Sequence, residues 1–282
     1  MHKKISIVFF GNSKYSVIDA EALFTHFGLS AIVTIPNRPG NRKEILVSPV
    51  KTFAKENNIP LIEALKLTGE IVEEIKKYKP DFLVVADYGL ILPKTLLVLP
   101  KYGALNVHHS LLPKYRGPSP APAAILAGDK ESGVSIITMN EKVDAGDILA
   151  QVPYTLAPDE TTDSLLTKLN TLRAKAVIEV IEQHLAGNVK KKVQDETKAV
   201  YTKFMSKTEG KINLTDRPEM NWRKIRAYGK WPGTYFLAEK NGKEIRVKIA
   251  KVSYESGALL IERVVPENGK EMGYDDFLRG MG

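Results

Sequence analysis

The sequence predicts an α/β fold in which a doubly wound parallel sheet is followed by a smaller β-barrel-like domain. Three observations support this fold class. Short apolar runs alternate with helical patterns through the first two thirds of the chain. Beyond residue 187, alternating residues on both sides of Asn241-Gly242 indicate a hairpin. The length of 282 residues suits two domains, since one domain typically has about 100 to 200 residues.

The elements of the first domain follow from the period of their apolar residues. The pattern predicts strands at residues 5–10, 30–35, 82–86 and 104–108, and helices at residues 16–27, 50–57 and 68–78. Strands and helices that alternate in this way are typical of βαβ units. The turn after the first strand lacks the second and third glycines of a dinucleotide fingerprint, so we do not predict NAD binding.

The next elements carry the chain to the second domain. We expect a short helix at residues 120–127, a strand at residues 134–139 and a long helix over residues 162–185, which ends at Ala186-Gly187-Asn188. Residues 189–196 are polar and charged, as in a linker. We therefore predict a catalytic domain at 1–187, a linker at 188–205 and a β-barrel-like domain at 206–282. Its hairpin joins residues 234–238 to residues 243–249.

The composition limits the possible chemistry. With 43% hydrophobic and 26% charged residues, the chain has the makeup of an ordinary soluble globular protein. It has no Cys, which excludes disulfides, thiolate metal sites and cysteine nucleophiles. The first apolar run, residues 5–10, is shorter than the roughly 7 to 15 residues of a signal-peptide core, so we interpret it as a buried strand. We expect a cytoplasmic protein without a membrane segment.

The positive charge lies mainly in the second domain. Residues 188–282 hold 20 Lys and Arg against 13 Asp and Glu, or +7, whereas residues 1–187 hold 21 against 20, or +1. A basic domain favours a polyanionic partner, because neutralising phosphates gives favourable, salt-sensitive binding. A solvated basic surface with no such partner fits the composition equally well.

The run from Asn106 to Gly117, with Asp144 in a later loop, predicts an acyl-transfer site. Asn106 and His108 are two residues apart on a predicted strand, so their side chains leave the same face near its carboxyl end. That edge is where open α/β sheets bind ligands. The amide of Asn106 and the imidazole of His108 could donate hydrogen bonds to an oxyanion. Asp144 would orient and stabilise the protonated imidazole.

Each of these residues also has a purely structural interpretation. Asn106 could bond the backbone at a strand end, Asp144 could cap the turn at Ala145-Gly146, and a single His is more often structural than catalytic. His109 points away from His108 on a strand, so we interpret it as structural or peripheral. We predict no metal site, because adjacent strand residues diverge and no further ligand cluster is evident.

These motifs resemble those of the folate-dependent formyltransferases, whose formyl donor is 10-formyltetrahydrofolate. The run Asn-x-His-x-Ser-Leu-Leu-Pro-x-Tyr-Arg-Gly at residues 106–117 and Asp-x-Gly-Asp at 144–147 carry the resemblance. Other segments are similar to the branch that acts on methionyl-tRNA. They are Asn37-Arg38-Pro39, Ser48-Pro49-Val50-Lys51, Tyr88-Gly89-Leu90-Ile91-Leu92-Pro93, Gln194-Asp195-Glu196-Thr197, Trp231-Pro232-Gly233 and Asp276-Phe277-Leu278-Arg279-Gly280. The resemblance spans nearly the whole chain.

The resemblance implies a Rossmann-like first domain, an oligonucleotide-binding-like barrel and formyl transfer to initiator methionyl-tRNA. The sequence leaves the oligomeric state open, and nothing in it demands more than a monomer. The catalytic residues would be Asn106, His108 and Asp144. The folate donor would contact Tyr88, Gly89, Leu90, Leu92, Pro93, Ser110, Leu111, Leu112 and Pro113. The tRNA would contact Arg38, Arg42, Lys43, Arg116, Lys190, Lys191 and Lys192.

Some of these assignments have alternatives. Arg116 could hold a carboxylate or phosphate, or only brace its loop. Residues 88–93 could be a plain strand-to-helix connection, and residues 37–44 a mobile charged loop. Between Gly257 and Ala258 the chain lacks roughly two strands of the family pattern, so we expect a trimmed or open barrel. The rival functions are a sugar-nucleotide N-formyltransferase, a hydrolase that deformylates the folate, and a non-catalytic RNA-binding protein.

Overall fold

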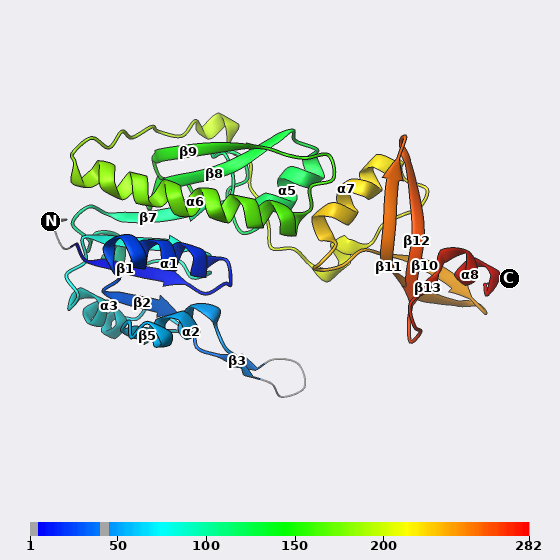
Figure 1. The fold of residues 1–282 in the computed structure, drawn as a ribbon, viewed down its shortest axis with the longest axis horizontal. Helices are drawn as coiled ribbons and strands as arrows, with labels where there is room; N and C mark the ends of the chain where they lie inside the picture. The colour runs from blue at the N-terminus through cyan, green and yellow to red at the C-terminus, as the bar shows by residue number, and fades with distance from the viewer. Residues whose placement is uncertain (1–4, 40–44, 282) are drawn as a thin grey trace. The chain divides into compact units, whose positions relative to one another are not determined.

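The computed structural model describes residues 5–39 and 45–281. The described chain forms two compact units (Figure 1). The first unit comprises residues up to Pro118, Glu131–Thr155 and Leu166–Thr202, and the second comprises Ser119–Lys130, Leu156–Leu165 and residues from Lys203 onward. Residues 188–202, in the predicted linker, thus cluster with the first unit. The domain boundaries at residues 187 and 205 stay a prediction.

The first unit is built on a seven-stranded sheet in the order β5-β2-β1-β6-β7-β8-β9. The strands are β1 Ile7–Gly11, β2 Ala31–Thr34, β5 Leu61–Glu63, β6 Phe82–Ala86, β7 Ala104–His108, β8 Glu131–Thr138 and β9 Ile148–Thr155. The strands from β5 to β7 run parallel to one another, whereas β8 pairs antiparallel with β7 and β9 with β8. The predicted parallel, doubly wound sheet is confirmed, and it carries an antiparallel edge.

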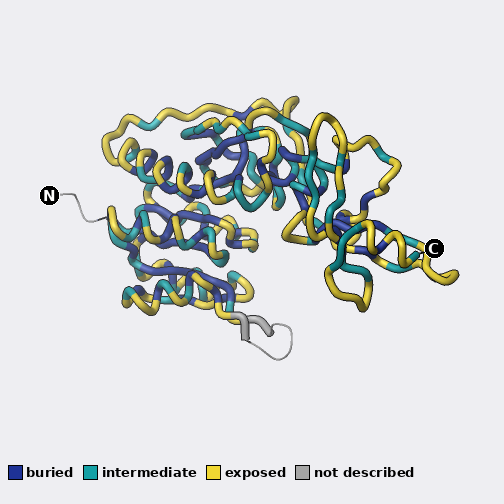
Figure 2. Tube along the Cα trace, turned by 45° about the vertical axis from the view of Figure 1, so that its right-hand side comes forward, coloured by how far each residue is buried: buried dark blue, intermediate teal, exposed yellow. Residues whose placement is uncertain are grey.

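Both faces of this sheet are buried by helices. Phe9 and neighbours that share its face form one core with residues of α1 (Ser16–Phe27), α2 (Pro49–Glu56) and α6 (Thr162–Leu185). Phe10 and its face form a second core with α3 (Gly69–Lys76) and α4 (Lys94–Leu97). Adjacent strand residues point to opposite faces, so continuous apolar runs such as 7–11 fill both cores. Figure 2 shows these strands as buried segments.

A short ladder precedes α2: β3 (Arg38–Pro39) pairs antiparallel with β4 (Ile45–Leu46). The predicted tRNA contacts Arg42 and Lys43 lie outside the described residues. Arg38 belongs to β3.

The second unit combines helices from three parts of the chain with a small sheet. Helix α5 (Pro120–Ala127) packs on α7 (Pro218–Tyr228). Strands β10 (Tyr235–Lys240), β11 (Lys243–Glu255), β12 (Ala258–Pro266) and β13 (Met272–Gly273) form an antiparallel sheet in chain order, followed by α8 (Tyr274–Arg279). Its core includes Phe236, Val247, Val264 and Phe277. The 3₁₀ turns η2 (Glu196–Lys198), within the first unit, and η3 (Lys207–Gly210) precede α7 along the chain.

The small sheet is open, in line with the trimmed barrel expected from the sequence. Strand β10 pairs only with β11, and β13 only with β12, among the strands that the structure describes. The predicted Asn241-Gly242 turn joins β10 to β11, with φ of 52° and 72°. A second tight turn at Ser256-Gly257 joins β11 directly to β12, where the sequence lacks the two strands of the family pattern.

Candidate active site

Asn106 and His108 lie near the carboxyl end of β7, on the parallel part of the sheet. His108 is buried and Asn106 is partly exposed. Strand β7 lies between β6 and β8, where the sheet changes from parallel to antiparallel pairing. The strand predicted at residues 104–108 forms with these bounds and brings both side chains to the same site.

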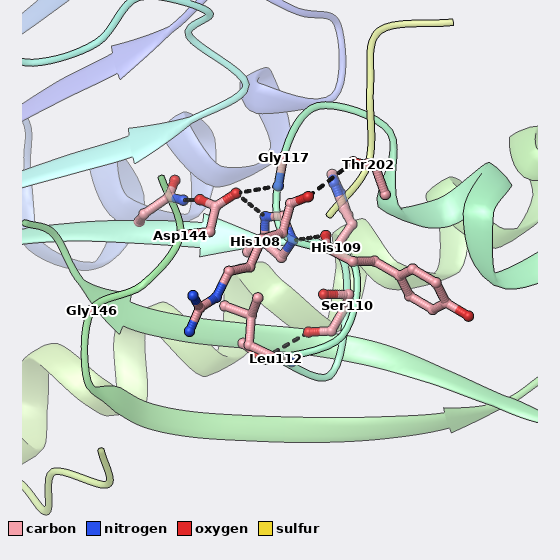
Figure 3. A network of polar contacts seen from close by, with 12 residues as sticks. His108, His109, Ser110, Leu112, Gly117, Asp144, Gly146 and Thr202 are labelled. Atoms are coloured by element: carbon pink, nitrogen blue, oxygen red, sulfur yellow. Dashed lines mark hydrogen bonds and ion pairs between the residues drawn. The ribbon is translucent and has the colours of Figure 1, made fainter. Parts of the chain in front are cut away.

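The Asp144 carboxylate joins these side chains. Its Oδ1 accepts a hydrogen bond of 2.9 Å from Nδ2 of Asn106. Its Oδ2 accepts one of 2.7 Å from the main-chain N–H of Gly117 and lies 3.5 Å from Nδ1 of His108 (Figure 3). Residues 106, 108 and 144, which the sequence predicts to act together, thus meet at one carboxylate, and the Gly117 N–H joins them. Whether they are the catalytic set stays a prediction.

The His108 ring is held on both sides. Its Nε2 lies 2.9 Å from the main-chain oxygen of Tyr115. A carbonyl oxygen can only accept, so Nε2 carries a proton and donates it. Since Nδ1 faces the Asp144 carboxylate, both ring nitrogens face oxygen atoms. This arrangement fixes the ring plane and presents His108 as a donor group.

Two residues at the site have left-handed backbone conformations. Asp144 has φ of 50° and Tyr115 has φ of 62°, values that are uncommon for residues other than glycine. Such conformations cost about 1–3 kcal/mol and persist where surrounding contacts hold them, often at functional sites. At these two positions the strain aims the Asp144 carboxylate and the Tyr115 carbonyl at His108.

The loop after β7 folds back on itself. Ser110 donates to the Lys114 oxygen at 2.6 Å, and its own carbonyl accepts from Ser135 Oγ at 2.6 Å. Ser135 Oγ accepts from the Leu112 N–H, and Gln151 donates to the Leu112 oxygen. Ser110 and Leu112 are therefore buried and shape the loop, while Leu111 and Pro113 are partly exposed. Their folate contacts stay a prediction.

Residues 88–93 follow β6 at the same edge of the sheet. Tyr88 is buried edge-on against Phe10, and burial raises the pKa of its hydroxyl to about 12. Gly89 has φ of 87°, which explains the glycine at this bend. Among the described residues, the main-chain groups of Leu90 and Leu92 have no hydrogen-bond partner. Polar backbone groups without partners, beside apolar side chains, suit the pterin contacts predicted for this segment, as they suit a connection that water solvates.

Arg116 is a fully buried guanidinium with partners on every side. Its Nε and NH2 donate to Gln194 Oε1 at 3.1 and 2.8 Å, and NH1 and NH2 donate to the two Glu196 oxygens at 2.9 and 2.8 Å. NH1 also donates to the Tyr201 hydroxyl. The hydrogen bonds from Arg116 hold the pKa of Glu196 below its usual range. Since no part of Arg116 is exposed, this geometry favours bracing of the loop over the predicted phosphate contact.

Gln194 extends this brace to the Asp144 loop. Its Nε2 donates to the carbonyl oxygens of Asp144 and Gly146, at 2.8 and 2.7 Å. In the sequence, only the family resemblance of the Gln-Asp-Glu motif marks this residue, and that resemblance implies no role for it. Residues 190–192, predicted to bind tRNA, are exposed and lie just before Gln194 in the chain. The main chain of Lys192 forms a single antiparallel β-bridge with that of Ile148.

A second polar cluster, which includes His109 and is buried except at Asp87, was not predicted. The Arg173 guanidinium lies 2.7 Å from Asp19 and 2.9 Å from Asp87. His109 lies 2.7 Å from Asn170 Oδ1 through Nε2, and its Nδ1 is 3.4 Å from Arg173. An amide oxygen only accepts, so Nε2 of His109 is protonated and Nδ1 faces the guanidinium as an acceptor. His109 is thus buried and bonded within the protein, and the structural or peripheral role suggested by the sequence stays a prediction.

Burial and mutual attraction set the charges in this cluster. Burial raises the pKa of Asp19 to about 7, although Arg173 opposes this rise. Burial and the neighbouring Arg173 lower the pKa of His109 to about 3, which leaves the ring neutral. For Asp87 the effect of burial is outweighed by Arg173 and His109, so its pKa lies below the usual range. No periodic sequence signal joins these residues, which come from four separate elements or loops.

The described residues contain no group of three or more His, Cys, Asp or Glu side chains arranged to hold a metal ion. In the same part of the chain, no helix is long and apolar enough to cross a membrane.

Comparison with known families agrees with this geometry. A family model described as "Formyl transferase" matches residues 6–181, and one described as "Formyl transferase, C-terminal domain" matches residues 205–258. The methionyl-tRNA formyltransferase of Listeria innocua is 39% identical over 262 residues, covering 91% of this chain and 84% of the relative. That of Carboxydothermus hydrogenoformans is 34% identical over 297 residues, covering 97% and 96%.

Solved structures share the fold at lower identity. Methionyl-tRNA formyltransferase from Clostridium thermocellum is 18% identical, with a TM-score of 0.59 over 95% of this chain and 99% of its own. A sugar 3N-formyl transferase, crystallised with dTDP and 5-N-formyl-THF, is 18% identical with a TM-score of 0.64, over 93% of each chain. At this identity the similarity establishes the fold alone.

Proposed function

The chain belongs to the methionyl-tRNA formyltransferase family, and from this membership we propose that it formylates the α-amino group of initiator methionyl-tRNA, with 10-formyltetrahydrofolate as donor. The observation that carries the proposal is the Asp144 carboxylate, which bonds Asn106 and Gly117 and faces His108 at the edge of the sheet. This arrangement supplies the donors and the carboxylate that direct formyl transfer needs.

The reaction places negative charge on the formyl oxygen. When the methionyl amine attacks the formyl carbon, that oxygen becomes an oxyanion in a tetrahedral intermediate. One N–H of the Asn106 amide donates to Asp144, which leaves its second N–H to donate to this oxygen. The Nε2 proton of His108 is the other donor, and the formyl oxygen would replace the Tyr115 carbonyl as its acceptor. Apo contacts of this kind commonly rearrange when substrate binds.

Asp144 has two roles in this scheme. Its contacts to Asn106 and His108 orient both donors before substrate arrives, so that little reorganisation is needed during the reaction. As a carboxylate beside the imidazole it also stabilises the protonated ring. The attacking amine must lose a proton, which Asp144 accepts through a water, and the leaving nitrogen of the folate gains one as the intermediate collapses.

The donor and the tRNA occupy different surfaces in this proposal. We assign the folate to residues 88–93, whose unpartnered main-chain groups at Leu90 and Leu92 follow β6 at the same sheet edge as Asn106. We assign tRNA phosphates to the exposed Lys190, Lys191 and Lys192, and to the basic part of the chain that begins at residue 188. A monomer in the cytoplasm is the state that we propose for the enzyme.

The first test is formyl transfer from 10-formyltetrahydrofolate to methionyl initiator tRNA, measured beside amino-sugar nucleotides as competing acceptors. We expect transfer to the tRNA. In His108→Ala it should fall by on the order of a hundred- to a thousandfold, the usual loss of an oxyanion donor. Transfer only to an amino-sugar nucleotide would show that the acceptor is this sugar and not the tRNA. Tight RNA binding without transfer to any acceptor would support the non-catalytic RNA-binding alternative. Release of formate in the absence of an acceptor would support the hydrolase.

A further inference from the structure

The segment that leads to the second unit is bonded to both loops of the active site. Gln194 donates to the carbonyl oxygens of Asp144 and Gly146 and accepts from Arg116. At Thr202 the first unit ends, and the chain passes into the second unit at Lys203. Residues 194–202, which we name the strap, therefore contact the Asp144 loop and the loop after β7 within one unit.

The main chain of Arg116 is fixed by the same strap. Its N–H donates to the Val200 oxygen at 2.8 Å, and its oxygen accepts from the Thr202 N–H at 2.7 Å. These two bonds hold the peptide on either side of Arg116 and thereby set the direction of the Tyr115 carbonyl, which lies one residue earlier. That carbonyl is the acceptor for Nε2 of His108. The Thr202 contact is visible in Figure 3.

The neighbouring glycines are packed too closely against other main-chain atoms to accept a side chain. A side chain at Gly117, where φ is 104°, would come within 2.8 Å of the Thr202 oxygen. One at Gly146 would come within 1.7 Å of the Thr138 oxygen. Gly117 supplies the N–H that binds Asp144, and Gly146 supplies a carbonyl that binds Gln194. The loop after β7 is thus packed closely against the strap at Thr202, and the Asp144 loop is packed closely against β8 at Thr138.

Resting on the proposed formyl transfer, we propose that Arg116 is a positioning residue and that the strap, through Arg116 and Gln194, sets the geometry of His108 and Asp144. The guanidinium is suited to this because its planar fork binds Gln194 and Glu196 at the same time. A lysine at position 116 keeps the charge, but its three donors share one nitrogen, so it cannot reproduce the four bonds that the planar guanidinium makes to Gln194 and Glu196. Arg116 itself touches neither substrate in this scheme.

The test compares Arg116→Lys and Gln194→Met with a matched pair of glutamate variants. Glu196→Gln weakens the ion pair to Arg116, whereas the control Glu182→Gln weakens a side-chain contact of equal length, 2.8 Å, to His26. Both glutamates are largely exposed, so neither change should prevent folding. The full chain is used throughout, and the unfolding temperature confirms that each variant is folded.

We expect kcat to fall by about 10- to 100-fold in Arg116→Lys and Gln194→Met, with KM for both substrates within about twofold. The kcat of Glu196→Gln should fall by a smaller factor, and the kcat of Glu182→Gln should equal that of the wild type. A loss confined to kcat indicates misplaced catalytic groups, because weakened substrate binding would raise KM. If Arg116→Lys does not fold, Glu196→Gln against Glu182→Gln decides the question.

A second measurement does not depend on activity. The NMR shifts of the Gly117 amide and of the His108 ring nitrogens report the contacts to Asp144 and Tyr115, with His108→Ala assigning the ring signals. These shifts should move in Arg116→Lys and Glu196→Gln and stay in place in Glu182→Gln. Unmoved shifts in the strap variants would overturn the proposal, whatever happens to kcat. Should the wild-type chain transfer no formyl group, the proposed function fails, but the shifts still test the positioning role.

Discussion

At the scale of single residues, one carboxylate organises the site. Asp144, itself in a loop, joins the Asn106 amide and the His108 imidazole, both on strand β7, to the main-chain N–H of Gly117 in the loop after that strand. Its φ of 50° is a backbone conformation in which residues other than glycine, Asn and Asp are rare. The residue type is therefore determined by its backbone as well as by its charge, and the two requirements can be separated by substitution.

Asp144→Asn should keep the backbone conformation and remove the charge. Asparagine tolerates φ near 50° and keeps one carbonyl acceptor, so the fold should be retained. In the proposed reaction, the variant lacks the negative charge beside His108 and has no carboxylate to take up the amine's proton. We expect kcat to drop by on the order of a hundredfold or more, with the unfolding temperature close to that of the wild type. Single-turnover transfer at the wild-type rate would rule out both the electrostatic and the proton-accepting role of Asp144.

The buried Asp19 gives the fold a pH dependence. Its pKa in the folded chain is about 7, above the 3.8 expected for the unfolded chain. Between these values the folded chain binds the additional proton, so the contribution of Asp19 to stability is full below about pH 4 and is lost as the pH rises to about 7. Arg173 and Asp87 are the charged groups that face it.

Comparison of wild type with Asp19→Asn isolates this contribution. The free energy of unfolding of the wild type, relative to the variant, should fall by about 1 kcal/mol per pH unit between about pH 5 and about pH 7, and level off above. Urea unfolding at a series of pH values measures this difference. Parallel stability curves for the two chains would show that Asp19 does not titrate in that range.

At the scale of elements, local sequence signals decided which predicted helices and strands have the bounds that the structure shows. Helix α5 forms at Pro120–Ala127 as predicted, because prolines begin it and Gly128 ends it in a left-handed conformation. Helix α6 likewise forms at Thr162–Leu185. Strand β9 (Ile148–Thr155) was not predicted, because it contains Pro153 and alternates weakly. It is an edge strand, the place in a sheet where a proline is tolerated.

The β10–β11 hairpin offers a test of turn chemistry. Asn241 and Gly242 both have positive φ, as a two-residue hairpin turn requires. A Cβ at Gly242 would meet no atom within 4 Å, so Gly242→Ala costs only the backbone conformation. We expect about 1 kcal/mol of destabilisation, measured by urea unfolding. Gly69→Ala is the control: its φ is not positive and its surroundings are open, so alanine at the start of α3 should not destabilise the chain.

At the scale of the whole molecule, the charge distribution predicts that binding of the proposed tRNA substrate depends on salt more strongly than binding of the proposed folate donor. Lys190, Lys191 and Lys192 are exposed at the start of the basic part of the chain. Phosphate contacts release counterions, so each one contributes about one unit to the slope of log affinity against log salt concentration. Residues 88–93, which we propose for the folate, carry no charged side chain, so the two Michaelis constants should respond differently to salt.

Changing these three lysines to Gln should raise KM for the tRNA and reduce its salt dependence by up to about three units, while KM for the folate stays constant. A matched triple, Lys66, Lys76 and Lys77 to Gln, removes the same charge from exposed positions of the first unit and should leave both constants unchanged. Equal effects from the two triples would mean that net charge alone matters, and that residues 190–192 form no site.

The sequence by itself determined the βαβ order of the first unit, the open hairpin sheet of the second, and the meeting of residues 106, 108 and 144. The order of the elements follows from short-range periodicity, whereas the open sheet and the meeting of these three residues were implied by the resemblance of several segments to a known family. Only the tertiary structure decided that Arg116 is buried against Gln194, that Asp144 also binds the Gly117 N–H, and that His109 rests on Asn170 and Arg173. The physical reason is separation along the chain: Arg116 and Gln194 are 78 residues apart, and buried polar groups find partners wherever packing brings them, without a periodic trace in the sequence.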